Sequence, residues 1–311
     1  MSVHEDDVLN EADQRWQRLV DTRPEIAEAV DLQRVLMTRT LELSAEAPDI
    51  LKLATAAPAD ILERLSQRDA PVLELGVEFN TERVTPFLLA FCNDFAVGGA
   101  GKPALNVRRA IEKGEIDSGS LMRGSLMRQQ AAIRTRATQL GISADIVWLV
   151  CELSVGPLAN LLQHGAFVSL HTTTRAVRDA ASHWPRGHCA ACGSWPALAE
   201  TWASVRHLRC SFCGADWNPP EEVCVYCGTG GATFLTAAET AQTTRRLEFC
   251  RSCGGYLKQV DVNRSTPFAL LPVLDLETSD LDVRAMERGY SRPSMHERTS
   301  ADPLCPPNTV T

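Results

Sequence analysis

Four pairs of cysteines dominate the sequence between residues 189 and 253, and two residues separate the cysteines of each pair. This spacing allows both sulfurs of a pair to bind one metal ion. The glycine that follows each pair permits the positive φ that turns backbone N–H groups toward the thiolates. Eight thiols in 65 residues therefore predict two tetrahedral sites with four sulfur ligands each. The pairs are Cys189 and Cys192, Cys210 and Cys213, Cys224 and Cys227, and Cys250 and Cys253, followed by Gly193, Gly214, Gly228 and Gly254.

The lengths of chain between the pairs predict which sulfurs share an ion. Successive pairs are separated by 17, 10 and 22 residues, and only the first and third gaps are long enough for a β-hairpin that carries its own knuckle. The short gap, which contains Pro219 and Pro220, is the expected joint between two ribbons. We therefore assign one ion to Cys189, Cys192, Cys210 and Cys213, and the other to Cys224, Cys227, Cys250 and Cys253.

A disulfide framework is the structural alternative for these cysteines. Disulfides are typical of exported proteins, and an export signal needs a basic run and then an apolar run. Residues 4–7 are instead one histidine and three acidic residues. The most apolar run, residues 146–151, is far shorter than the ~20 residues that span a bilayer. We therefore expect metal binding, a cytoplasmic location and no membrane partner.

The charge balance disfavours a nucleic-acid partner, which normally requires a basic surface. The formal net charge is −8 at pH 7. Between the first and last of the eight cysteines, five arginines face six acidic residues. A zinc-ribbon protein that binds nucleic acid or associates with transcription is therefore an alternative that the charge argues against.

Catalytic motifs do not stand out in this sequence. It contains no phosphate-binding glycine loop before a helix, no HExxH motif and no nucleophile elbow. The stretch at residues 98–101, Gly-Gly-Ala-Gly, lacks the following Lys-Ser or Lys-Thr of a nucleotide loop and predicts a turn. We therefore predict no catalytic residue and do not expect an enzyme. A small iron protein that transfers electrons is a further alternative.

The region before the cysteines has the apolar periodicity of helices. Apolar residues recur at three- and four-residue steps and predict a helical domain over residues 1–184. The expected helices include a long amphipathic one over 118–140, a central one over 146–162 and a last one over 167–181. Cys92 and Cys151 lie in apolar helical settings, and we expect both to be buried packing residues.

The region after residue 184 combines short strands with the cysteine pairs. Residues 205–210, 245–250 and 256–262 are expected strands, and residues 280–288 an expected helix. Trp195 and Trp217 are expected to shield the metal. The predicted fold class is α+β, with a helical domain over 1–184, a first ribbon over 185–222, a second ribbon with the C-terminal helix over 223–295, and a disordered tail over 296–311. Cys305 lies in that tail and is not a ligand candidate.

Four short segments resemble one protein family. They are CAACGS at 189–194, LRCSFC at 208–213 with Trp217 beyond it, CRSCGGYLK at 250–258, and LDVRAMERGY at 281–290. Together these segments resemble the FdhE family, accessory proteins for the maturation of formate dehydrogenase. The resemblance covers residues 185–295 closely and the helical domain only in length and arrangement.

The resemblance implies a cytoplasmic protein with a helical domain and two rubredoxin-like sites, whose eight cysteines are metal ligands. It also implies that the protein binds the catalytic (large) subunit of a respiratory, molybdenum- or tungsten-dependent formate dehydrogenase before that subunit is exported. A homodimer is compatible with the sequence. One departure is that the proline often found after the first knuckle cysteine is replaced here, which counts against a redox site more than against metal binding. The replacing residues are Ala190, Ser211, Val225 and Arg251.

Four thiolates suit zinc or iron. Ligand chemistry alone favours zinc, since structural sites with four sulfurs most often hold it, whereas the family resemblance favours iron. His188 and His207 lie beside the ligands in the sequence, but eight cysteines complete both sites without them. We therefore expect two mononuclear iron sites, with zinc as the alternative.

Overall fold

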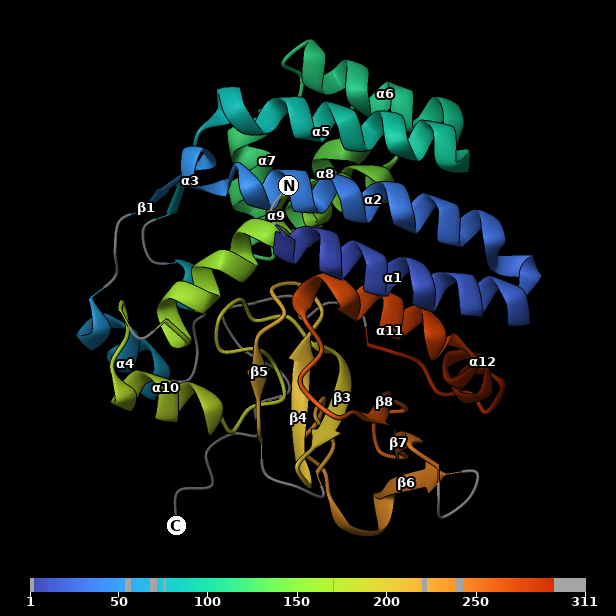
Figure 1. Ribbon diagram of the computed structural model, residues 1–311. Helices are drawn as coiled ribbons and strands as arrows, with labels where there is room; N and C mark the ends of the chain where they lie inside the picture. Colours follow the sequence, from blue (N-terminus) through green and yellow to red (C-terminus); the bar gives the residue numbers. More distant parts are fainter. Residues whose placement is uncertain are drawn as a thin grey trace.

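The structure, a computed structural model, describes residues 3–53, 57–67, 72–74, 77–169, 171–219, 223–238 and 243–293. Layers of helices lie above a six-stranded sheet, α4 and α10 lie beside it, and two helices from the C-terminal part lie between α1 and that sheet (Figure 1). The predicted α+β class is confirmed. The predicted tail at 296–311, with Cys305, and Pro220 lie outside the described residues.

The helical part is organised around α9 (Ala144–Phe167), which contacts α2, α5, α6, α7, α8 and α10. It begins where Ser143 Oγ accepts a hydrogen bond from the Ile146 backbone N–H at 3.4 Å, which satisfies a free amide of the first turn. The predicted central position is confirmed. The other helices are α1 (Val3–Thr22), α2 (Ala27–Ala45), α3 (Ala47–Ile50), α4 (Pro58–Gln67), α5 (Thr81–Phe95), α6 (Gly101–Glu112), α7 (Ser118–Leu126), α8 (Gln130–Gln139) and α10 (Arg175–Ser182).

The central helix is Ala144–Phe167 rather than 146–162, and the C-terminal one is Ser279–Glu287 rather than 280–288. Two other predicted helices differ more. The segment 118–140 is not one helix: α7 ends at Leu126 and α8 begins at Gln130, because Arg128 adopts φ 57° and pairs with Glu152 of α9. The last helix begins at Arg175 rather than at 167. Three successive threonines precede it, and the Thr174 side chain accepts from the Val177 backbone N–H. In both places a tertiary contact or a cap overrides the local pattern.

The helical part also contains a small sheet that the sequence did not predict. Strand β1 (Leu51–Leu53) pairs antiparallel with β2 (Val77–Phe79). Three-residue strands are too short to show the alternation by which strands are recognised in a sequence.

The two ribbons form one six-stranded sheet with the order β5-β4-β3-β8-β7-β6. All neighbouring strands are antiparallel except β3 and β8, which pair in parallel and join the ribbons. The predicted strands at 205–210 and 245–250 are confirmed, and the third ends one residue early. The strands are β3 (Pro196–Trp202), β4 (Val205–Cys210), β5 (Asp216–Trp217), β6 (Phe234–Ala238), β7 (Arg245–Cys250) and β8 (Tyr256–Asp261).

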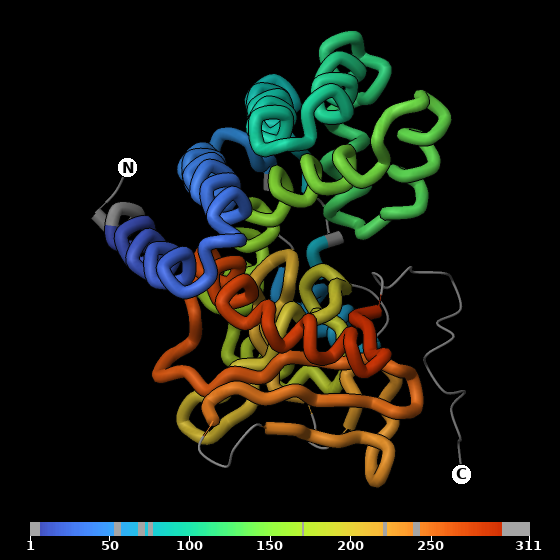
Figure 2. Tube along the Cα trace, turned by 90° about the vertical axis from the view of Figure 1, so that its right-hand side faces the viewer, coloured from blue at the N-terminus to red at the C-terminus, as the bar shows by residue number. Residues whose placement is uncertain are grey.

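Helices α11 (Leu271–Glu277) and α12 (Ser279–Glu287) connect the sheet to the helical part. Figure 2 shows both crossing beside the strands of the second ribbon. Arg15 of α1 pairs with Glu277 through two hydrogen bonds of 2.9 and 2.6 Å. On the other side, the fully buried Lys258 of β8 contacts Asp275 and Asp282 at 2.7 and 2.8 Å. These helices therefore attach both to the first helix of the chain and to the second ribbon.

Two helical stretches of the described residues are long and apolar enough to cross a bilayer, Thr81–Glu112 and Ala144–Phe167. Length and composition are weak evidence, since the core helix of a folded domain passes the same test. In Ala144–Phe167, 61% of the apolar window is buried inside the protein, as its central position requires.

Candidate metal centre

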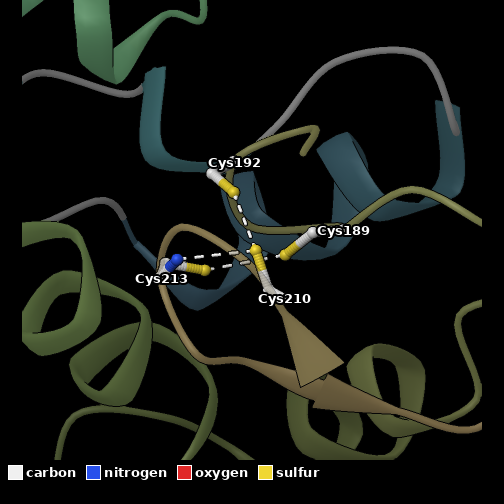
Figure 3. Close-up of side chains that lie close together, drawn as sticks. All are labelled: Cys189, Cys192, Cys210 and Cys213. Atoms are coloured by element: carbon white, nitrogen blue, oxygen red, sulfur yellow. Dashed lines mark hydrogen bonds between the residues drawn. The ribbon is translucent and has the colours of Figure 1, made fainter. Parts of the chain in front are cut away.

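The structure gathers the eight cysteines into the two groups that the spacing predicted. In each group the four sulfurs lie within 4.8 Å of one another. We name the group of Cys189, Cys192, Cys210 and Cys213 the first cluster, and the group of Cys224, Cys227, Cys250 and Cys253 the second cluster. Figure 3 shows the four side chains of the first cluster, two from a loop and two from the end of β4 and the turn after it, pointing toward one another.

The sulfur separations fit a metal ion and not disulfides. Four sulfurs about 2.3 Å from a tetrahedrally bound ion lie about 3.8 Å apart, whereas a disulfide bond is about 2.05 Å long. The first cluster has sulfur pairs at 3.4 and 3.7 Å, and the second has pairs at 3.6 and 3.7 Å. Each cluster can therefore hold one ion, and all the described cysteines are free thiols.

The glycines after each pair have the backbone geometry that the sequence predicted. Gly193, Gly214, Gly228 and Gly254 have φ between 70° and 79°, the left-handed region that favours glycine. In the knuckle of Cys210, the amides of Phe212 and Cys213 donate to the Cys210 sulfur at 3.4 and 3.5 Å. Such amides stabilise a thiolate, which is the form that binds metal.

A hydroxyl group accompanies the first knuckle of each cluster. Ser194 Oγ lies 3.4 Å from the Cys192 sulfur, and Thr229 Oγ1 lies 3.3 Å from the Cys227 sulfur. Both follow the second cysteine of their knuckle by two residues. Neither hydroxyl was predicted to lie beside a sulfur, although CAACGS at 189–194 and CVYCGT at 224–229 show the repeat in the sequence. The two clusters thus share a local architecture beyond their cysteines.

The clusters differ in exposure. All four cysteines of the first cluster are 0 to 1% exposed, whereas Cys227 is half-buried and Cys253 is exposed. The helical part encloses the first cluster from two sides. The amides of Val72 and Leu73 donate to the carbonyls of Ala190 and Ala191. A separate contact from α9 joins the Asn160 side-chain amide to the Cys213 carbonyl at 2.8 Å.

The two tryptophans occupy different positions near the clusters. Trp217 is 2% exposed and donates to the Arg186 carbonyl at 2.9 Å. The Trp195 ring lies edge-on to Tyr226, at 5.3 Å between centroids. Tyr226 stands between the two cysteines of a second-cluster knuckle, so Trp195, which follows the first knuckle of the first cluster, links the surroundings of both clusters.

Neither histidine near the ligands belongs to a cluster. The His207 ring stacks on Trp202 at 3.6 Å and its Nδ1 lies 3.2 Å from Asp216. The His188 ring contacts Trp184 and Trp195 edge-on. Aromatic rings thus contact both histidines, and a carboxylate also contacts His207.

The thiols of the chain fall into two electrostatic settings. Burial raises the pKa of Cys92 to about 12, and burial also raises the pKa of Cys151 well above its usual value. Both are 0% exposed, which confirms that they are packing residues. Burial likewise tends to raise the pKa of Cys227, but hydrogen bonds with Thr229 and with neighbouring thiols lower it to about 7. Hydrogen bonds thus favour the thiolate form of Cys227, whereas burial raises the pKa of Cys253 in the same cluster to about 11.

Comparison of the sequence with known proteins finds relatives that match parts of this chain. No family model matches it. It is 29% identical over 129 residues to the FdhE homolog of Aquifex aeolicus (39% of this chain, 44% of the relative). It is 32% identical over 106 residues to the FdhE homolog of Shewanella oneidensis (33% of this chain, 35% of the relative). It is 25% identical over 201 residues to FdhE of Salmonella paratyphi A (62% of this chain, 58% of the relative). The matches thus span about a third to three fifths of these curated relatives.

A solved structure extends the comparison to the fold. The crystal structure of FdhE from Pseudomonas aeruginosa has a TM-score of 0.55 to this chain at 20% identity, and the match covers 93% of this chain and 94% of that one. The fold contains two zinc-ribbon-like modules, each with a cluster of four cysteines that could hold one metal ion. The sequence relatives and this structural neighbour are all named FdhE, so the chain is similar to FdhE proteins in sequence over part of its length and in fold over nearly all of it.

Proposed function

We propose that this protein is a cytoplasmic accessory factor that binds the catalytic subunit of a formate dehydrogenase during its maturation. The observation that carries the proposal is the pair of four-cysteine clusters in a fold that matches FdhE over 93% of the chain. The curated relatives that share part of its sequence are also named FdhE. We place its role in binding rather than in catalysis.

We propose that the eight clustered cysteines are the metal ligands and that each cluster holds iron. Iron bound by four thiolates exchanges one electron with little change in geometry, whereas zinc supplies structure alone. Elemental analysis of protein purified with and without oxygen tests this proposal. Two iron ions per chain in the anaerobic sample are expected, and zinc alone in both samples would contradict the iron assignment.

The exposed rim of the second cluster is a part of the metal module that a client can reach and that includes a ligand sulfur. Cys253 is exposed, and so are its neighbours Arg251 and Ser252. The first cluster is enclosed, so a partner that senses or uses a bound ion meets the second cluster first. We therefore propose that the catalytic subunit binds over this rim.

Co-purification tests the client and the surface together. The tagged full-length chain, expressed in cells that contain the dehydrogenase, is expected to retain the catalytic subunit. Arg251→Glu is expected to weaken this retention, whereas Lys113→Glu, on an exposed residue at the end of α6, makes the same charge change in the helical part and is expected to leave it unchanged. Equal retention by both variants would contradict the proposed binding surface. Failure of the unaltered chain to retain the catalytic subunit would contradict the proposed identity of the client. A salt-dependent gel shift with DNA would instead support a nucleic-acid-binding ribbon.

A further inference from the structure

A buried cation from the helical part lies beside the first cluster. Arg128 is 4% exposed and stands in the turn between α7 and α8. Its φ of 57° is uncommon for a residue with a side chain, and such geometry persists where the surroundings fix it. The turn directs the side chain into the protein, where a charged group is seldom found unless it is paired.

The Arg128 guanidinium is held from two sides. Its Nη1 and Nη2 atoms donate to the two carboxylate oxygens of Glu152 at 2.5 and 2.7 Å, and Ser125 donates to the same carboxylate at 2.8 Å. On the other side, the guanidinium carbon lies 3.9 Å from the centroid of the Phe212 ring. Phe212 lies in the knuckle between Cys210 and Cys213, so the cation packs directly on a metal-binding turn.

The charge of Arg128 also reaches the sulfurs of the first cluster. It lies close enough to Cys192 and Cys210 to interact electrostatically with both. A divalent ion with four thiolates carries a net charge of about −2, because the ligands bind deprotonated. Burying uncompensated charge costs free energy, and every sulfur of this cluster is buried. At the second cluster, water reaches Cys253 and can solvate the same charge.

We propose that Arg128 is a positioning residue for the first cluster, whose guanidinium, held by Glu152, offsets the thiolate charge and retains the ion there. The helical part thereby contributes to metal retention at one cluster and not at the other. This inference rests on metal binding by the first cluster and does not depend on the identity of the client.

Release of zinc to a chromogenic chelator tests the proposal. The full-length chain, reconstituted with Zn²⁺ alone, is expected to release two ions in two phases, a fast one from the second cluster and a slow one from the first. Arg128→Met is expected to accelerate the slow phase by about tenfold or more and to leave the fast phase unchanged. Arg128→Lys, which keeps the charge, is expected to restore most of the slow release. Unchanged slow release in Arg128→Met would overturn the proposal, and absence of bound zinc in the unaltered chain would overturn the metal binding on which it rests.

A second substitution separates the charge effect from simple destabilisation. Arg128→Met leaves Glu152 buried without its partner, whereas Arg128→Met combined with Glu152→Gln removes the pair. If the double variant still releases the ion fast, the cation acts on the cluster. If it returns to slow release, Arg128 serves only to neutralise Glu152, and the proposal is wrong.

Two further variants complete the test. Arg246→Met breaks a more exposed pair with Asp261, and its slow phase should match that of the unaltered chain. If Arg128→Met does not fold, Glu152→Gln decides, because its amide oxygen can still accept a hydrogen bond from Arg128 and hold the guanidinium, while the negative charge beside the cation is removed. A slow phase of zinc release that is no faster than in the unaltered chain supports the proposal, and a faster slow phase overturns it.

Discussion

The two clusters have nearly the same local design and very different surroundings. Both combine two knuckles, positive-φ glycines and a hydroxyl group near one sulfur. The first is enclosed by the helical part, whereas the second reaches the surface at Cys253. The difference teaches that ligand spacing fixes the geometry of a site, while docking of distant segments fixes its access to water. We therefore expect the first ion to support the fold and the second to be available to other molecules.

Removing the ligands of one cluster gives the largest expected effect. The Cys210→Ser, Cys213→Ser double variant should lose one ion and most of the stability of the chain, since structural metal contributes ~10 kcal/mol or more and both knuckles of the first cluster contact the helical part. The Cys250→Ser, Cys253→Ser double variant should lose one ion with a smaller drop in melting temperature. Metal content and thermal unfolding measure both, and equal drops would remove the distinction between the clusters.

Lys258 attaches the second ribbon to α11 and α12 through Asp275 and Asp282. Replacing this fully buried lysine by methionine leaves Asp275 and Asp282 without one of their cations, and ~3 to 5 kcal/mol of stability should be lost. Denaturant unfolding measures the change. Lys113→Met, at an exposed position, is the control and should change stability little. A Lys258 variant as stable as the control would show that α11 and α12 do not secure this ribbon.

Two glycines of α9 allow a controlled test of the contact between this helix and the first cluster. A Cβ at Gly156 would lie 3.1 Å from the Phe212 carbonyl oxygen, whereas a Cβ at Gly165 would meet nothing within 4 Å. Gly156→Ala should destabilise the chain by ~1 to 3 kcal/mol and speed zinc release from the first cluster. Gly165→Ala should stabilise it by up to ~1 kcal/mol. Calorimetry measures the stability, and the same response in both variants would show that α9 does not press on the knuckle.

The hydroxyls beside the clusters should give the smallest effects. Ser194→Ala removes a buried hydroxyl next to Cys192 and should cost ~1 kcal/mol. Thr229→Val, beside the half-buried Cys227, should cost less, because water can replace the lost group. Thermal unfolding of the two variants compares them directly. A larger loss of stability in the Thr229 variant would contradict the expectation that the more buried hydroxyl contributes more.

The cysteine groupings could be predicted from the sequence because they depend on local lengths of chain. The bounds of β4 and β7 were predictable for the same reason, since each strand runs directly into a knuckle. The turn at Arg128 was not, because its cause is Glu152, 24 residues further along. The parallel pairing of β3 with β8 also escaped prediction, since alternation marks a strand but not its neighbour. The division of the chain at residues 184 and 222 stays a prediction.

The ion pair between Arg15 and Glu277 closes the chain over a separation of 262 residues. During synthesis, α1 therefore has no α11 to pack against until residue 277 has left the ribosome, which takes on the order of ten seconds or more. Strand β3 likewise waits for β8. The docking of α1 and the joining of the two ribbons are thus completed late, whereas the residues that enclose the first cluster, Val72, Leu73 and Asn160, are synthesised before its last cysteine.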